Sequence, residues 1–280
     1  HVYFVNYADQ AVYCQPIEEV EFGSDQKSEP RLITIPNSGF RYADFIYDAK
    51  RDHLICVRED HGGQGSLESV ASKVSNCIVS LPIGEAIVTE GEVLFSESDF
   101  VSSPTLSADA STLAFIWWDH PNMPWDMTTL AVASLTEDGY FSEVTHVQGP
   151  CPASILQPRF NGDRQLYVIS DWSGWWNIYR YDLSCLNVSA EPVNVCPLRA
   201  ETCSAQWQLG KYNYDFKVDG SIAVSICSEG HWSLLHIHAE VTQATAQGDR
   251  SYETILDGFG HIDCLCVFGE TLYFCGATST

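Results

Sequence analysis

The chain has few basic residues and no long apolar run. Lys and Arg number only 14 of its 280 residues, against 37 Asp and Glu, so the formal net charge is -23. Because binding to a phosphate backbone needs clustered Lys and Arg, we expect no nucleic-acid partner. No stretch of about 18 consecutive apolar residues occurs, so we expect no membrane span. A hydrophobic fraction of 45% with only 18% charged residues predicts a folded chain with a sizeable core.

Motifs of several catalytic and binding sites are also missing. No Ser is flanked by Gly as in the GxSxG elbow of hydrolases, and neither the phosphate-binding GxxxxGKS/T nor GxGxxG occurs. We therefore expect no catalytic residue, no cofactor and no metal in this chain. His236 and His238 would share one face of a strand, as metal ligands can, but no carboxylate or Cys at ligand spacing accompanies them. The alternative is two histidines on the outer side of a sheet.

Helical periodicity is absent too, since no segment keeps apolar residues at i, i+3, i+4 and i+7 over three turns. Instead, short apolar segments with strand character recur at a spacing of about 50 to 60 residues. They are VYFV from Val2, LICV from Leu54, LAFI from Leu113, LYVI from Leu166, IAVSI from Ile222 and LYFC from Leu272. A period of this length suits a four-stranded propeller blade with long loops.

Further strands accompany each apolar segment. An alternating segment follows it, such as SNCIVSLPI from Ser75, and then a third, such as EVTHV from Glu143. A strand with a polar turn precedes it, such as DFKVDGS from Asp215. The pattern predicts an all-β fold with little helix: one β-propeller domain over residues 1–280, built of four-stranded antiparallel blades. We expect about five to six blades, incomplete at both ends, with exposed loops at residues 18–30 and 62–75.

Eleven cysteines are present, and none forms a CxxC pair. Cys56, Cys227 and Cys275 lie in apolar strand segments, where Cys behaves as a small buried hydrophobe. We therefore expect mostly buried, reduced thiols and a cytoplasmic or other reducing compartment. The sequon at Asn187 would matter only in a secreted protein.

The segment WWDHPNMPWD, residues 117–126, is the sharpest local feature. We expect its three Trp side chains to pin the loop by burying large area and its two Asp side chains to bond neighbouring backbone amides. The loop would line the mouth of the propeller or dock on a second domain; the alternative is a loop packed only on its own blade. The candidate residues are Trp117, Trp118, Asp119, His120, Pro121, Asn122, Met123, Pro124, Trp125 and Asp126.

A second candidate loop lies in SDWSGWWN, from Ser170. Asp171 and Gly174 suit a tight hairpin, and Trp175 and Trp176 would begin the next strand. With Trp172, these residues are a second candidate contact surface, although the sequence favours a structural role.

The chain resembles the propeller of acylaminoacyl-peptidase-like and dipeptidyl-peptidase-like members of the prolyl oligopeptidase family of serine peptidases. The resemblance covers nearly the whole chain in the blocks RYADF, VREDH, LAFIWWDHPNMPWD, LAVASL, QPRF, SDWSGWWNIYRYDL and AQWQLG. It implies a propeller, commonly seven-bladed, stacked on an α/β-hydrolase domain that supplies Ser, Asp and His. This sequence contains no hydrolase domain, so no catalytic residue is carried over. Two turns also depart from the family pattern, at Asp109-Ala110 and at Asn161-Gly162-Asp163.

The resemblance implies a function. The chain would be a non-catalytic propeller that restricts access to a peptidase active site, inactive by itself, while the whole protein would be a serine peptidase. Its partner would be the hydrolase domain or another protein subunit, with peptides as candidate ligands. The alternatives are a free-standing propeller that binds a protein partner and a structural subunit of a larger assembly.

Overall fold

A computed structural model describes residues 1–17, 29–62, 74–84, 88–147, 149–162, 164–183, 191–239 and 252–278. Within these ranges the regular structure is β-strand, and no α-helix occurs. Accordingly, no helix in the described ranges is long and apolar enough to cross a membrane. The predicted loops 18–30 and 62–75 lie almost entirely outside these ranges, as does the sequon at Asn187.

The strands form five antiparallel sheets. The first contains β1 (Val2–Val5), β2 (Val12–Gln15) and β3 (Arg31–Leu32). The second contains β4 (Phe40–Asp48), β5 (His53–Asp60), β6 (Ser75–Pro82) and β7 (Glu92–Phe95). The third contains β8 (Phe100–Leu106), β9 (Thr112–Trp118), β10 (Thr129–Leu135) and β11 (Phe141–Val147).

The fourth sheet contains β12 (Ile155–Asn161), β13 (Gln165–Ser170), β14 (Asn177–Asp182) and β15 (Val193–Asn194). The fifth contains β16 (Tyr214–Phe216), β17 (Ile222–Ser228), β18 (His231–Ile237), β19 (Tyr252–Phe268) and β20 (Thr271–Thr278).

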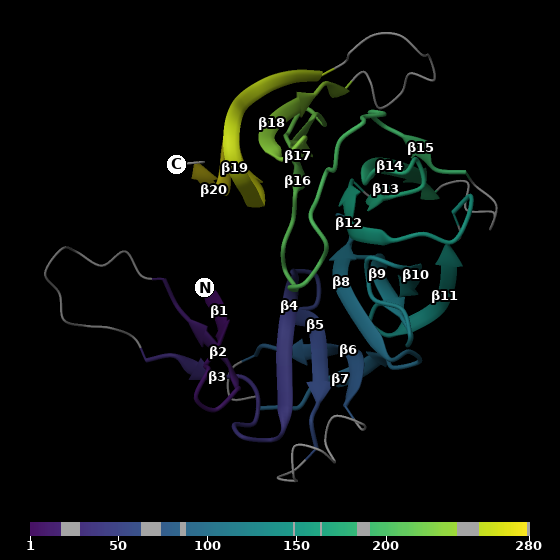
Figure 1. Ribbon diagram of the computed structural model, residues 1–280. Coiled ribbons are helices and arrows are strands. Elements are labelled where there is room, and N and C mark those ends of the chain that lie inside the picture. Colours follow the sequence, from purple (N-terminus) through teal and green to yellow (C-terminus); the bar gives the residue numbers. More distant parts are fainter. Residues whose placement is uncertain are drawn as a thin grey trace, which may run out of the picture.

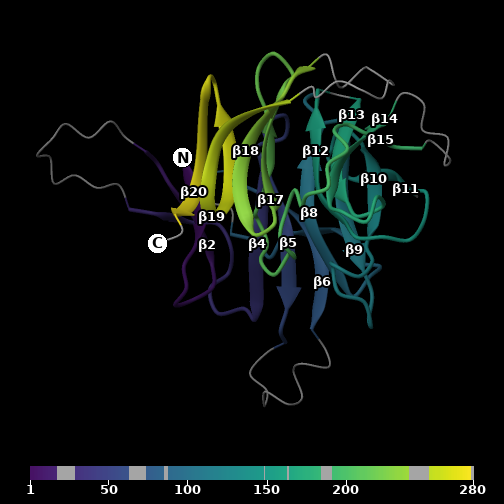
Figure 2. The ribbon, with the colours of Figure 1, turned by 45° about the horizontal axis from the view of Figure 1, so that its top comes forward.

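The five sheets stand as blades around a common centre (Figure 1). Figure 2 shows their strands running through the depth of the ring. In the second, third and fourth blades the strands follow chain order from the centre outward, and the inner strands contact one another, as β4 does β8 and β8 does β12. The predicted all-β propeller is therefore confirmed, with five blades that are mostly four-stranded.

Strand β19 connects the last blade to one more hairpin. Its first part, residues 252–259, pairs with β18, and its second part, residues 259–268, pairs with β20. Strand β20 thus takes the place in the repeat that β5, β9, β13 and β17 take in their blades. The six apolar segments of the sequence correspond to β1, β5, β9, β13, β17 and β20.

The core lies between neighbouring blades. In β9, Leu113 and Phe115 face the second blade, where they pack in one cluster with Ile55. The alternate residues Ala114 and Ile116 face the fourth blade and pack in another cluster. Because side chains alternate along a strand, a blade covered on both faces needs apolar residues at consecutive positions. This double burial explains the uninterrupted apolar segments of the repeat.

The cysteines follow the blade packing only in part. The ten described cysteines, all except Cys185, are free thiols. Cys56 is buried as predicted, but Cys227 is half-buried and Cys275 is exposed. The prediction of burial was wrong for Cys275, because β20 lies at the edge of its sheet and has a strand on one side only. The reducing compartment stays a prediction.

Candidate functional site

Both candidate loops open at the same end of the propeller. Strands within a blade alternate in direction, so the connections after each second strand emerge at the end where the chain passes to the next blade. The tryptophan loop (residues 117–126) connects β9 to β10, and the second loop (residues 171–176) connects β13 to β14. The long connection from β15 to β16 begins at this end as well. We call this end the loop end.

Trp117 and Trp118 hold the tryptophan loop to its own blade. The indole of Trp118 stacks on Phe100 of β8, with ring centroids 5.3 Å apart. The indole Nε1 of Trp117 donates to Nδ1 of His146 on β11 at 3.3 Å. Trp117 and Trp118 therefore hold the loop in place, as the burial argument predicted.

Polar contacts then fix the turn. The carboxylate of Asp119 accepts the backbone N–H of Asp99 at 2.7 Å, and that of Asp126 accepts the backbone N–H of Met123 at 2.9 Å. His120 donates its backbone N–H to the carboxylate of Asp99, which also lies 2.9 Å from its ring Nδ1. Both Asp side chains thus bond backbone amides, but only Asp126 bonds one within the loop as predicted, whereas Asp119 bonds an amide 20 residues earlier in the chain.

The end of the loop reaches beyond its own blade. The Ser154 hydroxyl, just before β12 of the fourth blade, donates to the carbonyl of Pro124 at 2.7 Å. The ring of Trp125 lies 4.6 Å from that of Trp207, which belongs to the β15–β16 connection. The loop is therefore ordered and not packed on its own blade alone, whereas its role in binding stays a prediction.

The second loop is a tight turn. Gly174 has a φ of 82° and donates its N–H to the carbonyl of Asp171 at 2.8 Å. Trp172 packs at right angles on Tyr179 and donates to the carbonyl of Cys151 at 2.9 Å. The hairpin is confirmed, and these contacts are structural; Trp175, at 39% exposed, offers the larger free surface.

The β15–β16 connection carries a segment that the sequence did not single out as a site. We call residues 204–213 the axial segment, because it descends toward the ring centre before returning to β16 (Figure 1). Its contacts reach several inner strands. Gln206 donates to the Ser103 hydroxyl of β8 at 3.3 Å, and Lys211 pairs with Asp263 of β19 at 2.5 Å.

Two side-chain amides anchor the axial segment to the fourth blade. Gln157 of β12 donates its amide N–H to Oδ1 of Asn213 at 2.9 Å and accepts the Asn213 backbone N–H at 2.8 Å. The Asn213 amide in turn donates to the Ser225 hydroxyl of β17 at 3.0 Å. All three residues are buried, so the satisfied network fixes the segment firmly.

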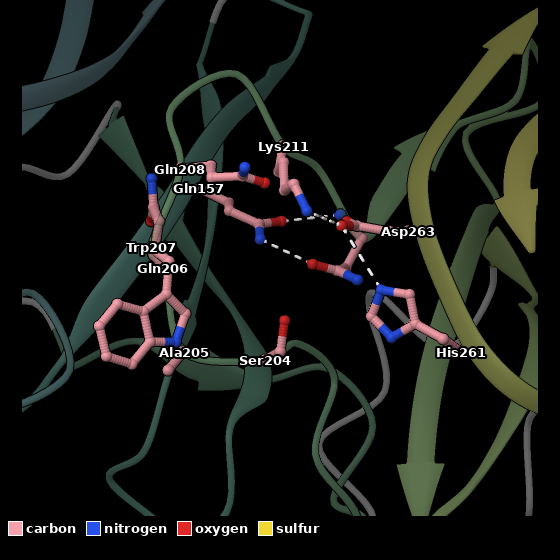
Figure 3. A pocket seen from close by; sticks show the side chains of 10 residues that line it. Gln157, Ser204, Ala205, Gln206, Trp207, Gln208, Lys211, His261 and Asp263 are labelled. Atoms are coloured by element: carbon pink, nitrogen blue, oxygen red, sulfur yellow. Dashed lines mark hydrogen bonds and ion pairs between the residues drawn. The ribbon is translucent and has the colours of Figure 1, made fainter.

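A polar cavity of about 230 Å³ lies beside this network (Figure 3). Its lining includes the Lys211–Asp263 pair, and Nε2 of His261 lies 3.7 Å from Oδ2 of Asp263. The hydrogen bond to Asp263 raises the pKa of Lys211, so that its ammonium stays charged. Trp207, at 78% exposed, borders the cavity. The cavity can therefore offer a cation, an anion and an aromatic face to a polar ligand.

Ser204 also lines the cavity, and among the described residues no hydrogen bond joins its hydroxyl to His261.

On the other side of the axial segment, a second set of charged groups lies beside Tyr212. Arg159 of β12 forms an ion pair with Asp215 of β16, and its guanidinium lies 4.1 Å from the ring centroid of Tyr212. Asp215 also accepts the backbone N–H of Val267 of β19 at 2.8 Å. The axial segment thus lies between two polar clusters, one with the Lys211–Asp263 pair and one with the Arg159–Asp215 pair. Together they join the fourth and fifth blades to the second part of β19.

The inner strands share a bulge that supports this arrangement. Asp44, Ser103, Gln157 and Cys264 have φ angles of 60°, 55°, 50° and 54°, each where the register with the next strand shifts. The carboxylate of Asp44 accepts the backbone N–H groups of Ser103 and Gly210. Burial raises the pKa of Asp44 to about 6, an increase that these two N–H groups limit. A polar residue shortly before each apolar segment was the available sequence signal.

The structure also brings a carboxylate to the His236 and His238 pair. Strand β19 places Glu253 directly opposite His236 of β18. The sequence expectation that no carboxylate accompanies the pair was therefore wrong across the sheet, although it holds along the strand. The reason is that the third group lies on the neighbouring strand, where spacing along the sequence of β18 gives no sign of it.

No family model and no curated protein sequence matches the chain. Among solved structures, it is similar to a puromycin-hydrolysing peptidase of Mycobacterium tuberculosis, at 29% identity with a TM-score of 0.77 over 98% of this chain and 39% of that chain. It is similar to a puromycin hydrolase complexed with PGG, at 25% identity with a TM-score of 0.81 over 99% of this chain and 40% of that chain. TolB from Acinetobacter baumannii shares the fold, at 12% identity with a TM-score of 0.54 over 92% of this chain and 52% of that chain.

These comparisons confirm the predicted resemblance. The chain is a propeller domain that matches puromycin hydrolase structures, and it spans about 40% of their length.

Proposed function

We propose that this chain is the non-catalytic propeller of a serine peptidase of the puromycin-hydrolase kind, and that it restricts the access of peptides to a hydrolase domain. The observation that carries the proposal is the match of 98–99% of the chain to a part of two such enzymes. About 60% of the length of each enzyme lies outside the matched part, which leaves ample room for a catalytic domain.

The axial segment supports a restricting role. Its contacts with Ser103, Gln157 and Asp263 join the third blade, the fourth blade and β19 across the centre. A long polypeptide would have to break these contacts to pass along the axis, whereas a short peptide that enters at the loop end would not. Filtering by size follows from a centre that is closed by its own hydrogen bonds.

The loop end has groups that suit a short peptide. Lys211 can bind a terminal carboxylate, and the paired rings of Trp125 and Trp207 can stack on an aromatic or apolar side chain. In the whole protein the hydrolase domain would cover this end, so a bound peptide would lie between the two domains. Closure of the two domains would exclude water from the reaction.

The test uses the protein in which this chain is joined to a hydrolase domain. We expect hydrolysis of aminoacyl and dipeptidyl p-nitroanilides and little cleavage of unfolded casein. Trp207→Ala should change kcat/KM for a tripeptide substrate by about tenfold, corresponding to about 1.4 kcal/mol. The matched control is Val218→Ala, which replaces an 83% exposed side chain in the β16–β17 turn at the opposite end. Equal effects of the two substitutions would argue against a substrate site at the loop end.

A protein-interaction module remains the second candidate, favoured by the large exposed area of Trp207 at the loop end. If this chain forms no complex with a hydrolase domain in size-exclusion chromatography, the peptidase proposal is wrong. A free-standing binding propeller would then fit better.

A further inference from the structure

His236, His238 and Glu253 form a compact cluster at the outer side of the fifth blade. His236 lies in β18, and His238 follows two residues later, just after the strand ends. Both side chains therefore project from one face of the sheet. Glu253 of β19 is the direct cross-strand partner of His236. Three potential ligands from two adjacent strands therefore meet on the same face.

The distances within this cluster are short. Nδ1 of His236 lies 3.0 Å from Oε1 of Glu253, and the two imidazole ring centroids are 4.7 Å apart. One ligand atom from each residue can be chosen so that all three lie within 4.8 Å of one another. Ligands held at 2.0–2.2 Å from a zinc ion lie roughly 3.3 Å apart at tetrahedral angles. Small side-chain rotations close the remaining difference, since His238 and Glu253 are exposed and free to adjust.

One buried nitrogen of the cluster has no hydrogen-bond partner among the described residues, which indicates a ligand. This nitrogen is Nε2 of His236. When Nδ1 donates its proton to Glu253, Nε2 carries a buried lone pair without a donor, which is unfavourable by roughly 1–3 kcal/mol in general. A metal ion bound to this lone pair would relieve the deficit, and a rotation of the exposed Glu253 side chain would bring its carboxylate from Nδ1 to the ion.

The donor set of the cluster suits a divalent cation. One carboxylate with two imidazoles is a combination of ligands that zinc prefers. On the same face of β18, Trp232 and Leu234 are buried, so an apolar layer lies next to the donors.

We propose that His236, His238 and Glu253 bind one Zn²⁺ ion that clamps the ends of β18 and β19. Three protein ligands leave a fourth position for water or for a further side chain. The clamp would fasten the outer strands of the fifth blade, and it does not depend on the proposed peptidase function.

The first test is metal content and affinity. The chain is dialysed against Zn²⁺ and then against buffer, and its zinc is counted by mass spectrometry; titration with a colorimetric chelator gives the affinity. We expect one Zn²⁺ per chain and a higher Tm with zinc than with EDTA. His238→Gln and Glu253→Gln should each weaken binding by at least about tenfold. Both replace exposed side chains, so the variants should fold.

The matched control is His231→Gln, an exposed histidine at the opposite end of β18, which should keep full affinity. Substitution of Co²⁺ for Zn²⁺ separates this site from the free cysteines, because thiolate ligands add an intense charge-transfer band and nitrogen or oxygen ligands do not. Visible cobalt absorption without that band, lost in His238→Gln, supports the site. Zinc content unchanged in His238→Gln and Glu253→Gln, a thiolate band, or no bound zinc in the native chain would overturn it.

Discussion

Replacing Asp44 by Asn should remove a pH dependence of stability that arises from one buried carboxyl group. Asp44 is 9% exposed, and its Oδ2 accepts the Ser103 N–H at 2.6 Å, while the Gly210 N–H is its second donor. It therefore connects the second blade to the third blade and to the axial segment. Burial raises its pKa from 3.8 to about 6.

The sign follows from proton binding. Between pH 3.8 and 6 the folded chain holds the Asp44 proton while the unfolded chain has released it. Stability from this group is thus fully present below the unfolded pKa and is lost as the pH rises through about 6. The full difference is about 3 kcal/mol, from 1.36 kcal/mol per pKa unit. Between pH 7.5 and pH 5 the share recovered is about half of this, on the order of 1 kcal/mol.

Urea unfolding at pH 5, 6 and 7.5 measures this share while staying above the isoelectric point of about 4.5. The free energy of unfolding of the native chain, minus that of Asp44→Asn, should rise by roughly 1 kcal/mol from pH 7.5 to pH 5. The control Glu97→Gln removes an exposed carboxylate and should show no such change. A difference that is the same at all three pH values would refute the idea that Asp44 titrates near pH 6.

Three further predictions test other parts of the structure. Arg51→Ala should lower the free energy of unfolding by about 3–5 kcal/mol, because it leaves the Asp48 carboxylate, only 1% exposed, without its ion-pair partner at 2.6 Å. Lys50→Ala is the control, because it removes only an exposed ion pair with Glu137. In the same urea titration it should lower the free energy of unfolding by less than about 1 kcal/mol. Thiol titration of the native chain should detect the four exposed cysteines, Cys151, Cys264, Cys266 and Cys275, before the five buried ones, which should react only in denaturant; simultaneous reaction of all would contradict the packing. The chain alone should resist a fluorophosphonate probe and hydrolyse no peptide substrate, since no Ser lies in a GxSxG turn; labelling of any Ser would disprove this.

The blades could be predicted because each of their strands is recognised from a short run of neighbouring residues. Strands such as β9 and β13 are covered on both faces, so their positions are marked by short apolar runs that need no knowledge of distant residues. The turns between strands could likewise be predicted from a few neighbouring residues. At Asp109-Ala110, where Asp-Gly is usual, Ala110 still adopts a φ of 54° and Ser111 donates its N–H to Asp109, so the turn keeps its shape.

The candidate site could be predicted only in part, because its contacts join distant repeats. Gln206 and Ser103 are 103 residues apart, and Gln157 and Asn213 are 56 apart. No periodicity reveals which polar residue of one blade meets which residue of another. The same holds for His236, whose partner Glu253 lies 17 residues further along the chain and becomes a neighbour only through the register of β18 and β19.

The burial of tryptophan side chains explains the structure of the candidate loop but does not determine its function. Burial of a Trp side chain removes roughly 150–250 Å² from water at about 25 cal/mol per Å². Trp117 and Trp118 obtain this within their own blade. Trp125 instead packs on Trp207, which remains 78% exposed, so roughly 3–5 kcal/mol of transfer free energy stays available at the loop end. The stability of the propeller itself does not explain such a surface beside Lys211 and Asp263, and under the proposed function a domain or a peptide would cover it.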